Sequence, residues 1–414
     1  MFSFFRDASD VLSGRAALTP FMAFFVYVWA VWGAKALAAR RYRPYTASPR
    51  GLRTSVLVPV YNEREAIFRR SLAGVRANGP TEMIAVIDGG DEGLAAIARE
   101  LCDMVVAIPK SGKRAAIASG LAVTDPSTDV VIVLDSDTVW ADGALTEMLR
   151  PFADPRVGGV TPRQAVFEPG ENPVRRLADW IEDVRYHLTV PAQSLFGQVG
   201  CLAGRTIAYR RSAFEPAVAR LVRQTVLGVP QHVGDDRVLT NELLRAGWKT
   251  VYQSTALVET DAPSDWPTYW RQQLRWGRSS QRETLLSLGW LWRRPVAFAC
   301  FAADIVTPFA LFAVMALAIA HGIRGHGPAG LPLALELPLG YLGMLASIGL
   351  RQIPRLRRQP RDIERLPLFV LQITFVVVPL RIAAFATMFH QGWTSRPSRP
   401  LYARESVIAG ELGS

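Results

Sequence analysis

The chain has 414 residues, half of them hydrophobic, and a formal net charge of +11. This hydrophobic share is high for a purely soluble protein and low for a purely membrane-embedded one, so we expect a soluble domain joined to membrane segments. Much of the arginine excess lies beside apolar stretches, at 40–43, 293–294 and 355–358, which favours a membrane protein that follows the positive-inside rule over a nucleic-acid binder.

The first element is an apolar stretch at residues 17–38, followed by a cluster of arginines at 40–43. About 20 such residues span a bilayer. A signal peptide would carry its basic residues before the apolar run, and here they follow it. We therefore expect an N-terminal segment, 1–50, with one transmembrane helix, residues 1–16 outside the cell and the following domain in the cytoplasm.

Residues 51–262 have the pattern of a soluble α/β domain. Short β-branched runs alternate with helix-like segments, which predicts a mostly parallel sheet with crossover helices. The runs are 55–60, 83–88 and 130–134, and the helix-like segments include 63–77 and 112–123. Acidic residues follow the strand ends, at Glu63, Asp88, Asp135 and Asp137. Ligands of open α/β sheets bind at the carboxyl ends of the strands, so we expect these side chains in one cleft.

Two amphipathic stretches flank the end of this domain. Residues 173–190 carry apolar side chains at helical spacing, and the pattern fits either a membrane interface or packing against the soluble domain. Residues 263–294 are rich in Trp and Arg and are followed directly by apolar sequence, which predicts a helix in the membrane interface.

The C-terminal region, 295–390, contains three further apolar stretches, at about 295–320, 331–351 and 366–390. The first two are each long enough to span a bilayer. Pro379 and Arg381 interrupt the third, and a centred Arg costs about 2.5–3.5 kcal/mol on insertion scales. This third stretch is therefore expected to be bent, re-entrant or lining a channel. A tail, 391–414, follows.

Asp135-Ser136-Asp137 follows the apolar strand 130–134 and predicts a metal site. Two carboxylates at this spacing can share a divalent cation that neutralises a diphosphate leaving group. The three cysteines are far apart and the five histidines scattered, which argues against a disulfide framework or a zinc site. Carboxylate ligands suit Mg²⁺ or Mn²⁺. The tripeptide is common, so its value depends on the strand before it and on the other motifs.

Three further motifs are candidates for chemistry. Gly234-Asp235-Asp236-Arg237 can supply a general base for an acceptor hydroxyl, or an acidic pair that caps a helix at 237–246. Gln272-Gln273-Leu274-Arg275-Trp276 combines a guanidinium that can clamp phosphate with a flat ring that can support a sugar, although interfacial anchors have the same composition. Lys113-Arg114, after Gly112, suits an anion at a helix N-terminus or is a solvated pair.

Taken together, residues 54–396 resemble the processive family 2 glycosyltransferases, and most closely the hyaluronan synthases. The resemblance is carried by Val58-Pro59-Val60-Tyr61-Asn62-Glu63, Val86-Ile87-Asp88-Gly89, Gly112-Lys113-Arg114, Asp135-Ser136-Asp137, the segment 193–210 with Cys201 and Gly204, Gly234-Asp235-Asp236-Arg237, Gln272 with Arg275-Trp276, and Trp393-Thr394-Ser395-Arg396. It implies a GT-A-type α/β domain on interfacial helices, beside an α-helical transmembrane bundle through which a polysaccharide is secreted.

The resemblance also implies roles for individual residues. Asp236 would be the catalytic base, and Asp135 and Asp137 would hold the metal ion, Mg²⁺ or Mn²⁺. The donor would be bound by Tyr61, Glu63, Asp88, Lys113, Asp135, Arg275, Trp393 and Arg396. The acceptor would be bound by Cys201, Asp235, Gln272 and Trp276.

The implied function is a metal-dependent, inverting polymerisation of UDP-sugars, hyaluronan-like, with UDP-GlcNAc and UDP-GlcUA as donors. Alternatives are a chitin-like or capsular polysaccharide synthase, and a non-processive transferase that acts on a lipid acceptor. Arg205 departs from the family, which usually has Pro there, beside the acceptor. The expected partners are UDP-sugars, the growing polysaccharide and the bilayer, without nucleic acid, in a monomer or small homo-oligomer of the cell membrane.

The tail adds a topological expectation. If 366–390 crossed the membrane fully, Trp393 and Arg396 would lie outside the cell, away from the donor diphosphate. We therefore hypothesise that this stretch bends at Pro379 and returns.

Overall fold

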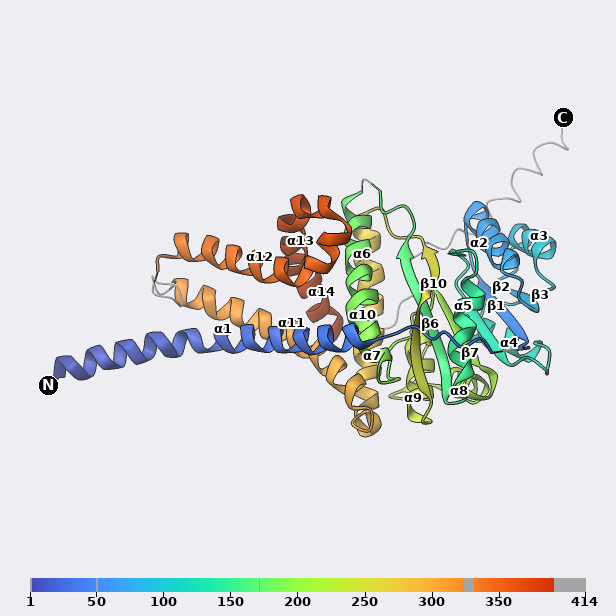
Figure 1. Ribbon diagram of the computed structural model, residues 1–414, viewed down its shortest axis with the longest axis horizontal. Coiled ribbons are helices and arrows are strands. Elements are labelled where there is room, and N and C mark those ends of the chain that lie inside the picture. The colour runs from blue at the N-terminus through green and yellow to red at the C-terminus, as the bar shows by residue number, and fades with distance from the viewer. Residues whose placement is uncertain (1, 50, 171, 324–330, 391–414) are drawn as a thin grey trace, which may run out of the picture.

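The computed structural model describes residues 2–49, 51–170, 172–323 and 331–390. It consists of an α/β domain and a group of helices that extend from one side of it (Figure 1). Helices α6 (Pro173–Val184) and α10 (Trp266–Leu291) stand between these two parts. This arrangement matches the expected combination of an α/β domain, amphipathic helices and a helical bundle.

The described residues form an eight-stranded sheet with the order β3-β2-β1-β4-β7-β6-β10-β5. Its strands are β1 (Thr54–Val60), β2 (Glu82–Asp88), β3 (Met104–Ile108), β4 (Val130–Leu134), β5 (Thr138–Trp140), β6 (Val157–Val166), β7 (Thr206–Arg210) and β10 (Lys249–Thr260). Strands β1 to β4 run parallel, whereas β7 is antiparallel to both β4 and β6, and β5 is antiparallel to β10. A short hairpin of β8 (Thr225–Val226) and β9 (Val229–Pro230) lies apart from this sheet.

Both faces of the sheet are covered, because β1 and β4 are buried at every position and place alternate side chains in two cores. One core is shared with α2 (Glu65–Ala77), α3 (Glu92–Leu101) and α5 (Ala144–Leu149), and the other with α4 (Lys113–Ala122), α8 (Arg211–Arg223) and α9 (Asp235–Arg245). The predicted strands at 55–60, 83–88 and 130–134 and the helices at 63–77 and 112–123 correspond to β1, β2, β4, α2 and α4.

The amphipathic stretch 173–190 is α6 followed by a π-helical turn, η2 (Arg185–Thr189), and α7 (Val190–Ser194). Asn172 caps α6 by accepting the N–H groups of Val174 and Arg175. The apolar face of α6 packs against other helices, since Trp180 stacks on Phe369 at a centroid distance of 4.1 Å. Packing within the protein therefore accounts for this face.

Three helices among the described residues are long and apolar enough to cross a membrane: Leu18–Arg41 of α1 (Phe2–Arg41), α11 (Pro295–Ile323), and Pro360–Ala386. These indicate a membrane protein. The expected span 331–351 lies on α12 (Leu333–Arg358), which is long enough but is not among these three. Helix α12 lies beside α1 and α11 (Figure 1), and Trp29 of α1 donates to Ser347 of α12 at 3.1 Å.

The last apolar stretch contains an irregular turn just before Pro379. It runs through η3 (Pro360–Arg365), α13 (Leu366–Gln372), a π-helical turn η4 (Ile373–Val377) and α14 (Val378–Ala386), and Pro379 lies in the first turn of α14, where proline is tolerated. The irregularity therefore precedes the proline. The tail with Trp393 and Arg396 lies outside the described residues.

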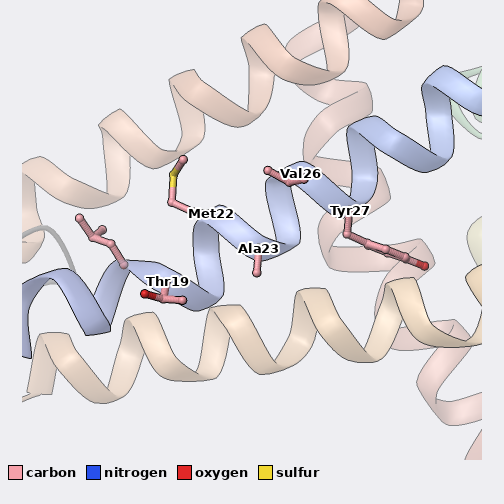
Figure 2. A pocket seen from close by; sticks show the side chains of 6 residues that line it. Thr19, Met22, Ala23, Val26 and Tyr27 are labelled. Atoms are coloured by element: carbon pink, nitrogen blue, oxygen red, sulfur yellow. The ribbon is translucent and has the colours of Figure 1, made fainter.

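A cavity of about 530 Å³ lies along α1 and is lined by Leu18, Thr19, Met22, Ala23, Val26 and Tyr27 (Figure 2). Its lining is mostly apolar and belongs to a candidate membrane span. The cavity is therefore a feature of the helical bundle, remote in the sequence from every acidic motif.

Candidate active site

The carboxyl ends of β1, β2 and β4 bring the predicted acidic residues to one edge of the sheet. Glu63, after β1, accepts a hydrogen bond of 2.8 Å from the hydroxyl of Ser136, which lies between the two aspartates after β4. The ammonium of Lys110 lies over the ring of Tyr61. Parallel pairing of these strands explains the convergence, because the ends of parallel neighbours meet at the same edge.

Asp88, at the end of β2, is 4% exposed and holds the loop that leads into α4. Its carboxylate accepts the N–H groups of Ser111, at 2.6 Å, and Gly112, at 2.9 Å, and pairs with Lys110 at 3.1 Å. Both oxygens are thus engaged by the loop. A contact with a donor base, as the resemblance implies, remains a prediction.

Lys113 joins the two halves of the site. Its ammonium lies 2.6 Å from Asp135 and 3.0 Å from Asp235, two aspartates that are 100 residues apart in the sequence. Burial alone would lower the pKa of Lys113, but the two carboxylates outweigh it and raise that pKa above its ordinary value. Lys113 is therefore a fixed cation between the predicted metal motif and the predicted base motif, and not a solvated residue.

Asp235 and Asp236 form the first turn of α9. The preceding Gly234 has φ +85°, a left-handed conformation that suits glycine, and it sets the turn from which the helix starts. Asp236 accepts the N–H of Arg237 at 2.7 Å and that of Gly204 at 3.2 Å, and the thiol of Cys201 lies 3.9 Å from it. The pair thus both stabilises the helix start and faces the segment 201–204.

The pKa values of the two neighbouring carboxyl groups are shifted in opposite directions. Burial, and then the charge of Asp235, raise the pKa of Asp236. Burial would also raise the pKa of Asp235, but Lys113 overcomes it and lowers that pKa. Beside them, burial and Asp236 raise the pKa of the Cys201 thiol to about 12, so the thiol stays protonated. Divergent carboxylate pKa values are typical of an acid–base site.

Arg205 connects the metal motif to the aromatic platform of α10. Its carbonyl accepts the N–H of Asp135 at 2.9 Å, and its guanidinium lies 5.5 Å from the ring centroid of Trp276. The same guanidinium pairs with Glu182 of α6 at 3.0 Å, with both side chains largely buried. The departure from the family at Arg205 is therefore matched by a carboxylate from another helix.

Sequence reasoning missed Glu182, which had no motif around it. A buried charged residue rarely lacks a partner, but the burial of Glu182 depends on how α6 packs and leaves no local signal in the sequence. It also missed the polar face that α10 buries in its second half, which is described below.

The structure places most of the predicted residues and leaves some apart. Gln272, Arg275 and Trp276 share the first half of α10, each partly buried. Tyr61, Glu63, Asp88, Lys113, Asp135, Cys201, Asp235 and Asp236 lie in the contacts described above. Trp393 and Arg396 lie outside the described residues.

The described residues contain no group of three or more His, Cys, Asp or Glu side chains that could hold a metal ion together. Asp135 and Asp137 nevertheless fit a hard cation. Both carry carboxylate oxygens just after a buried strand, and the Asp135 side chain is one-third exposed. Mg²⁺ commonly uses one or two carboxylates and completes its shell with water and substrate phosphates, so a two-carboxylate site suits it.

The comparisons with known proteins agree on one family. The family model "Glycosyltransferase like family 2" matches residues 49–279. A hyaluronan synthase of Streptococcus pyogenes is 29% identical over 86% of this chain and 86% of its own length. An N-acetylglucosaminyltransferase of Azorhizobium caulinodans is 30% identical over 85% of this chain and 89% of its own length.

A solved structure shares the fold. The mannosyltransferase of Pyrobaculum calidifontis, in complex with GDP-Man and Mn²⁺, superposes with a TM-score of 0.56 and 18% identity, and the match covers 86% of this chain and 99% of that one. The α/β domain thus has the GT-A-like arrangement of glycosyltransferases.

Proposed function

The chain belongs to glycosyltransferase family 2, and from this premise we propose that it transfers sugars from a UDP-linked donor, with inversion, to a growing polysaccharide. The acceptor hydroxyl oxygen attacks the anomeric carbon, the bond to the diphosphate breaks, the hydroxyl proton passes to Asp236, and UDP leaves. A divalent cation on Asp135 and Asp137 would neutralise the charge that develops on the leaving diphosphate.

The contact that carries this proposal is the double ion pair of Lys113 with Asp135 and Asp235. It holds the candidate metal motif and the candidate base motif within the reach of one side chain. A donor sugar on the metal side and an acceptor hydroxyl beside Asp236 would then be neighbours, which is the geometry that direct displacement requires.

The raised pKa of Asp236 supports its role as the base. A base is most effective when its pKa approaches the working pH, and burial beside Asp235 moves an aspartate in that direction. Cys201 lies 3.9 Å from Asp236, and the ring of Trp276 lies 5.5 Å from the guanidinium of Arg205; these contacts support assigning the acceptor to Cys201 and Trp276, with Asp235 and Gln272. Tyr61, Glu63, Asp88, Lys113 and Arg275 are assigned to the donor.

For the product we propose a hyaluronan-like polymer made from UDP-GlcNAc and UDP-GlcUA. Similarity to hyaluronan synthases over most of both chains supports it. The second candidate is a polymer or oligomer of N-acetylglucosamine, which the comparable similarity to N-acetylglucosaminyltransferases favours. The α/β domain would face the cytoplasm, and the helices would pass the product across the membrane.

The test is sugar incorporation by the purified full-length protein with UDP-GlcNAc, UDP-GlcUA and UDP-Glc, singly and in pairs, with Mg²⁺ or Mn²⁺. Polymer that requires the first two donors together supports the hyaluronan-like product. Incorporation from UDP-GlcNAc alone supports the second candidate. Absence of transfer with every donor and either metal would contradict the proposed function.

A further inference from the structure

The second half of α10 buries a polar face. The residues are Ser279, Gln281, Arg282, Glu283, Thr284 and Ser287, each at most 5% exposed. Burying so many polar groups costs free energy unless each finds a partner. The hydrogen-bond partners of these side chains therefore show which segments this half of α10 holds in place.

Arg282 is the central residue of this face and is 2% exposed. One of its terminal nitrogens donates to the carbonyl of Val233 and the other to the carbonyl of Met388, each at 3.3 Å. Val233 directly precedes the Gly234-Asp235-Asp236 turn, and Met388 follows α14 near the end of the described chain. A single guanidinium thus bridges the candidate catalytic turn and the end of the last apolar segment.

A second arginine holds the same carbonyl. Arg114 of α4, the neighbour of Lys113, donates to Val233 at 2.9 Å and to the side-chain oxygen of Gln224 at 2.9 Å. The amide of Gln224 in turn donates to both oxygens of Glu283, at 3.0 and 3.1 Å. The Glu283 carboxylate lies 3.7 Å from Arg282 and offsets part of the buried positive charge.

The catalytic turn also touches α10 directly. A Cβ atom added to Gly234 would overlap the hydroxyl oxygen of Ser279. The turn is therefore fixed on one side by close packing and on the carbonyl of Val233 by two charge-assisted donors, which are stronger than neutral ones. Asp236 lies three residues after Val233 in the chain. The position of its carboxylate therefore depends on how firmly the Val233 carbonyl is held.

From these contacts we infer that Arg282 is a positioning residue for Asp236, and that it couples the candidate catalytic turn to the end of the last apolar segment at Met388. The inference rests on the proposed role of Asp236 as the base. Arg282 acts through the backbone and is not assigned a contact with either substrate. Misplacement of a reacting group by about 1 Å can cost on the order of 100-fold in rate, so loss of one anchor should appear in turnover.

The test compares the full-length protein with Arg282→Met and Arg282→Lys. Lysine keeps the charge but lacks the planar fork that reaches two carbonyls at once. Arg278→Met is the matched control: Arg278 lies one turn earlier on α10 and donates to Thr387 at 2.8 Å, but no contact links it to Val233.

We expect Arg282→Met to lower kcat by about 10- to 100-fold while the donor KM and the number of UDP molecules bound per chain stay at wild-type values. Arg282→Lys should fall between Arg282→Met and wild type, and Arg278→Met should match wild type. Wild-type kcat in Arg282→Met would overturn the inference. So would a loss of turnover that merely follows a loss of UDP-binding sites, because that is a folding defect.

Hydrogen–deuterium exchange of the segment 231–238 provides a readout that does not depend on transfer. Faster exchange in Arg282→Met, but not in Arg278→Met, supports the anchorage, and unchanged exchange overturns it. If wild type transfers no sugar, the proposed function fails while exchange still decides the anchorage. If Arg282→Met does not fold, the kcat and exchange of Arg282→Lys decide in the same way.

Discussion

At the scale of residues, the site is organised by a chain of neighbouring charged side chains. Lys113 lies between Asp135 and Asp235, and Asp235 in turn lies beside Asp236. Removing one charge therefore changes the proton affinity of its neighbour. This gives the site a testable pH signature.

Asp235→Asn should move the acid limb of the kcat profile to lower pH. A base works only when deprotonated, so activity is present above the pKa of Asp236 and is lost as the pH falls through it. Burial and Asp235 raise that pKa, so the loss begins at a higher pH than for an ordinary aspartate. Removing the Asp235 charge lowers the pKa of Asp236 and delays the loss.

The measurement is kcat against pH for wild type, Asp235→Asn and a control, Asp142→Asn, an exposed residue before α5. The control should leave the limb in place. If the acid limb does not shift in Asp235→Asn, the charge of Asp235 does not influence the group that titrates, and the prediction is wrong.

The buried pair of Arg205 and Glu182 gives a prediction for stability. Glu182→Gln leaves the Arg205 charge buried without its carboxylate at 3.0 Å, and breaking such a pair typically costs about 3–5 kcal/mol. The midpoint of thermal unfolding of the purified protein should therefore be clearly lower for Glu182→Gln than for wild type. Glu100→Gln, which breaks an exposed pair with Arg69, should change the midpoint little. Equal midpoints for both variants would contradict the buried pairing.

Sequence reasoning found the acidic motifs because strand ends and short spacings are local. It could not find Glu182, since its pairing with Arg205 depends on how α6 packs beside the segment before β7. Likewise, the sequence fitted Lys113-Arg114 equally well as an anion site or as a solvated pair. Only the structure shows Lys113 between two carboxylates.

At the scale of elements, α9 starts directly against α10. Gly234→Ala should abolish transfer, because an added Cβ would both overlap Ser279 and strain a residue at φ +85°. Gly228→Ala is the matched control: its φ is +79°, but no atom lies within 4 Å of the added Cβ. It carries the left-handed strain of about 1–2 kcal/mol without the overlap. Transfer assays should show an active control, and replacing Ser279 by glycine in Gly234→Ala should restore part of the activity.

The elements themselves were largely predictable. Strands β1, β2 and β4 and helices α2, α4, α6 and α10 follow from β-branched runs and helical periodicity. The π-helical turns at 185–189 and 373–377 were not predicted, because an irregular turn within a helix arises from packing and leaves no periodic signal. A bend was expected at Pro379, and the π-helical turn at 373–377 ends two residues before it.

At the scale of the whole molecule, both ends of the last apolar segment contact the helical layer between the bundle and the sheet. Phe369 near its start stacks on Trp180 of α6, and Met388 at its end accepts from Arg282 of α10. Figure 1 shows α13 and α14 beside this layer, whereas α1, α11 and α12 extend away from it. This arrangement agrees with a segment that returns to the side from which it starts.

The prediction is that the tail stays on the side of the α/β domain. A single cysteine placed by Ser398→Cys in a chain without Cys102, Cys201 and Cys300 should resist a membrane-impermeant maleimide in intact cells and react after permeabilisation. Labelling in intact cells would contradict it. A cysteine at the exposed Asp142 serves as the reference for the domain side.

The central claim is that Asp236 is the base of sugar transfer, beside a donor held through Asp135 and Asp137. The most direct measurement is transfer and UDP binding by Asp236→Asn, which keeps the size of the side chain and removes its basicity. We predict a fall in transfer of at least about 1,000-fold, within the range for loss of a general base, with UDP bound at essentially the wild-type affinity. Transfer at the wild-type rate by Asp236→Asn would contradict the account.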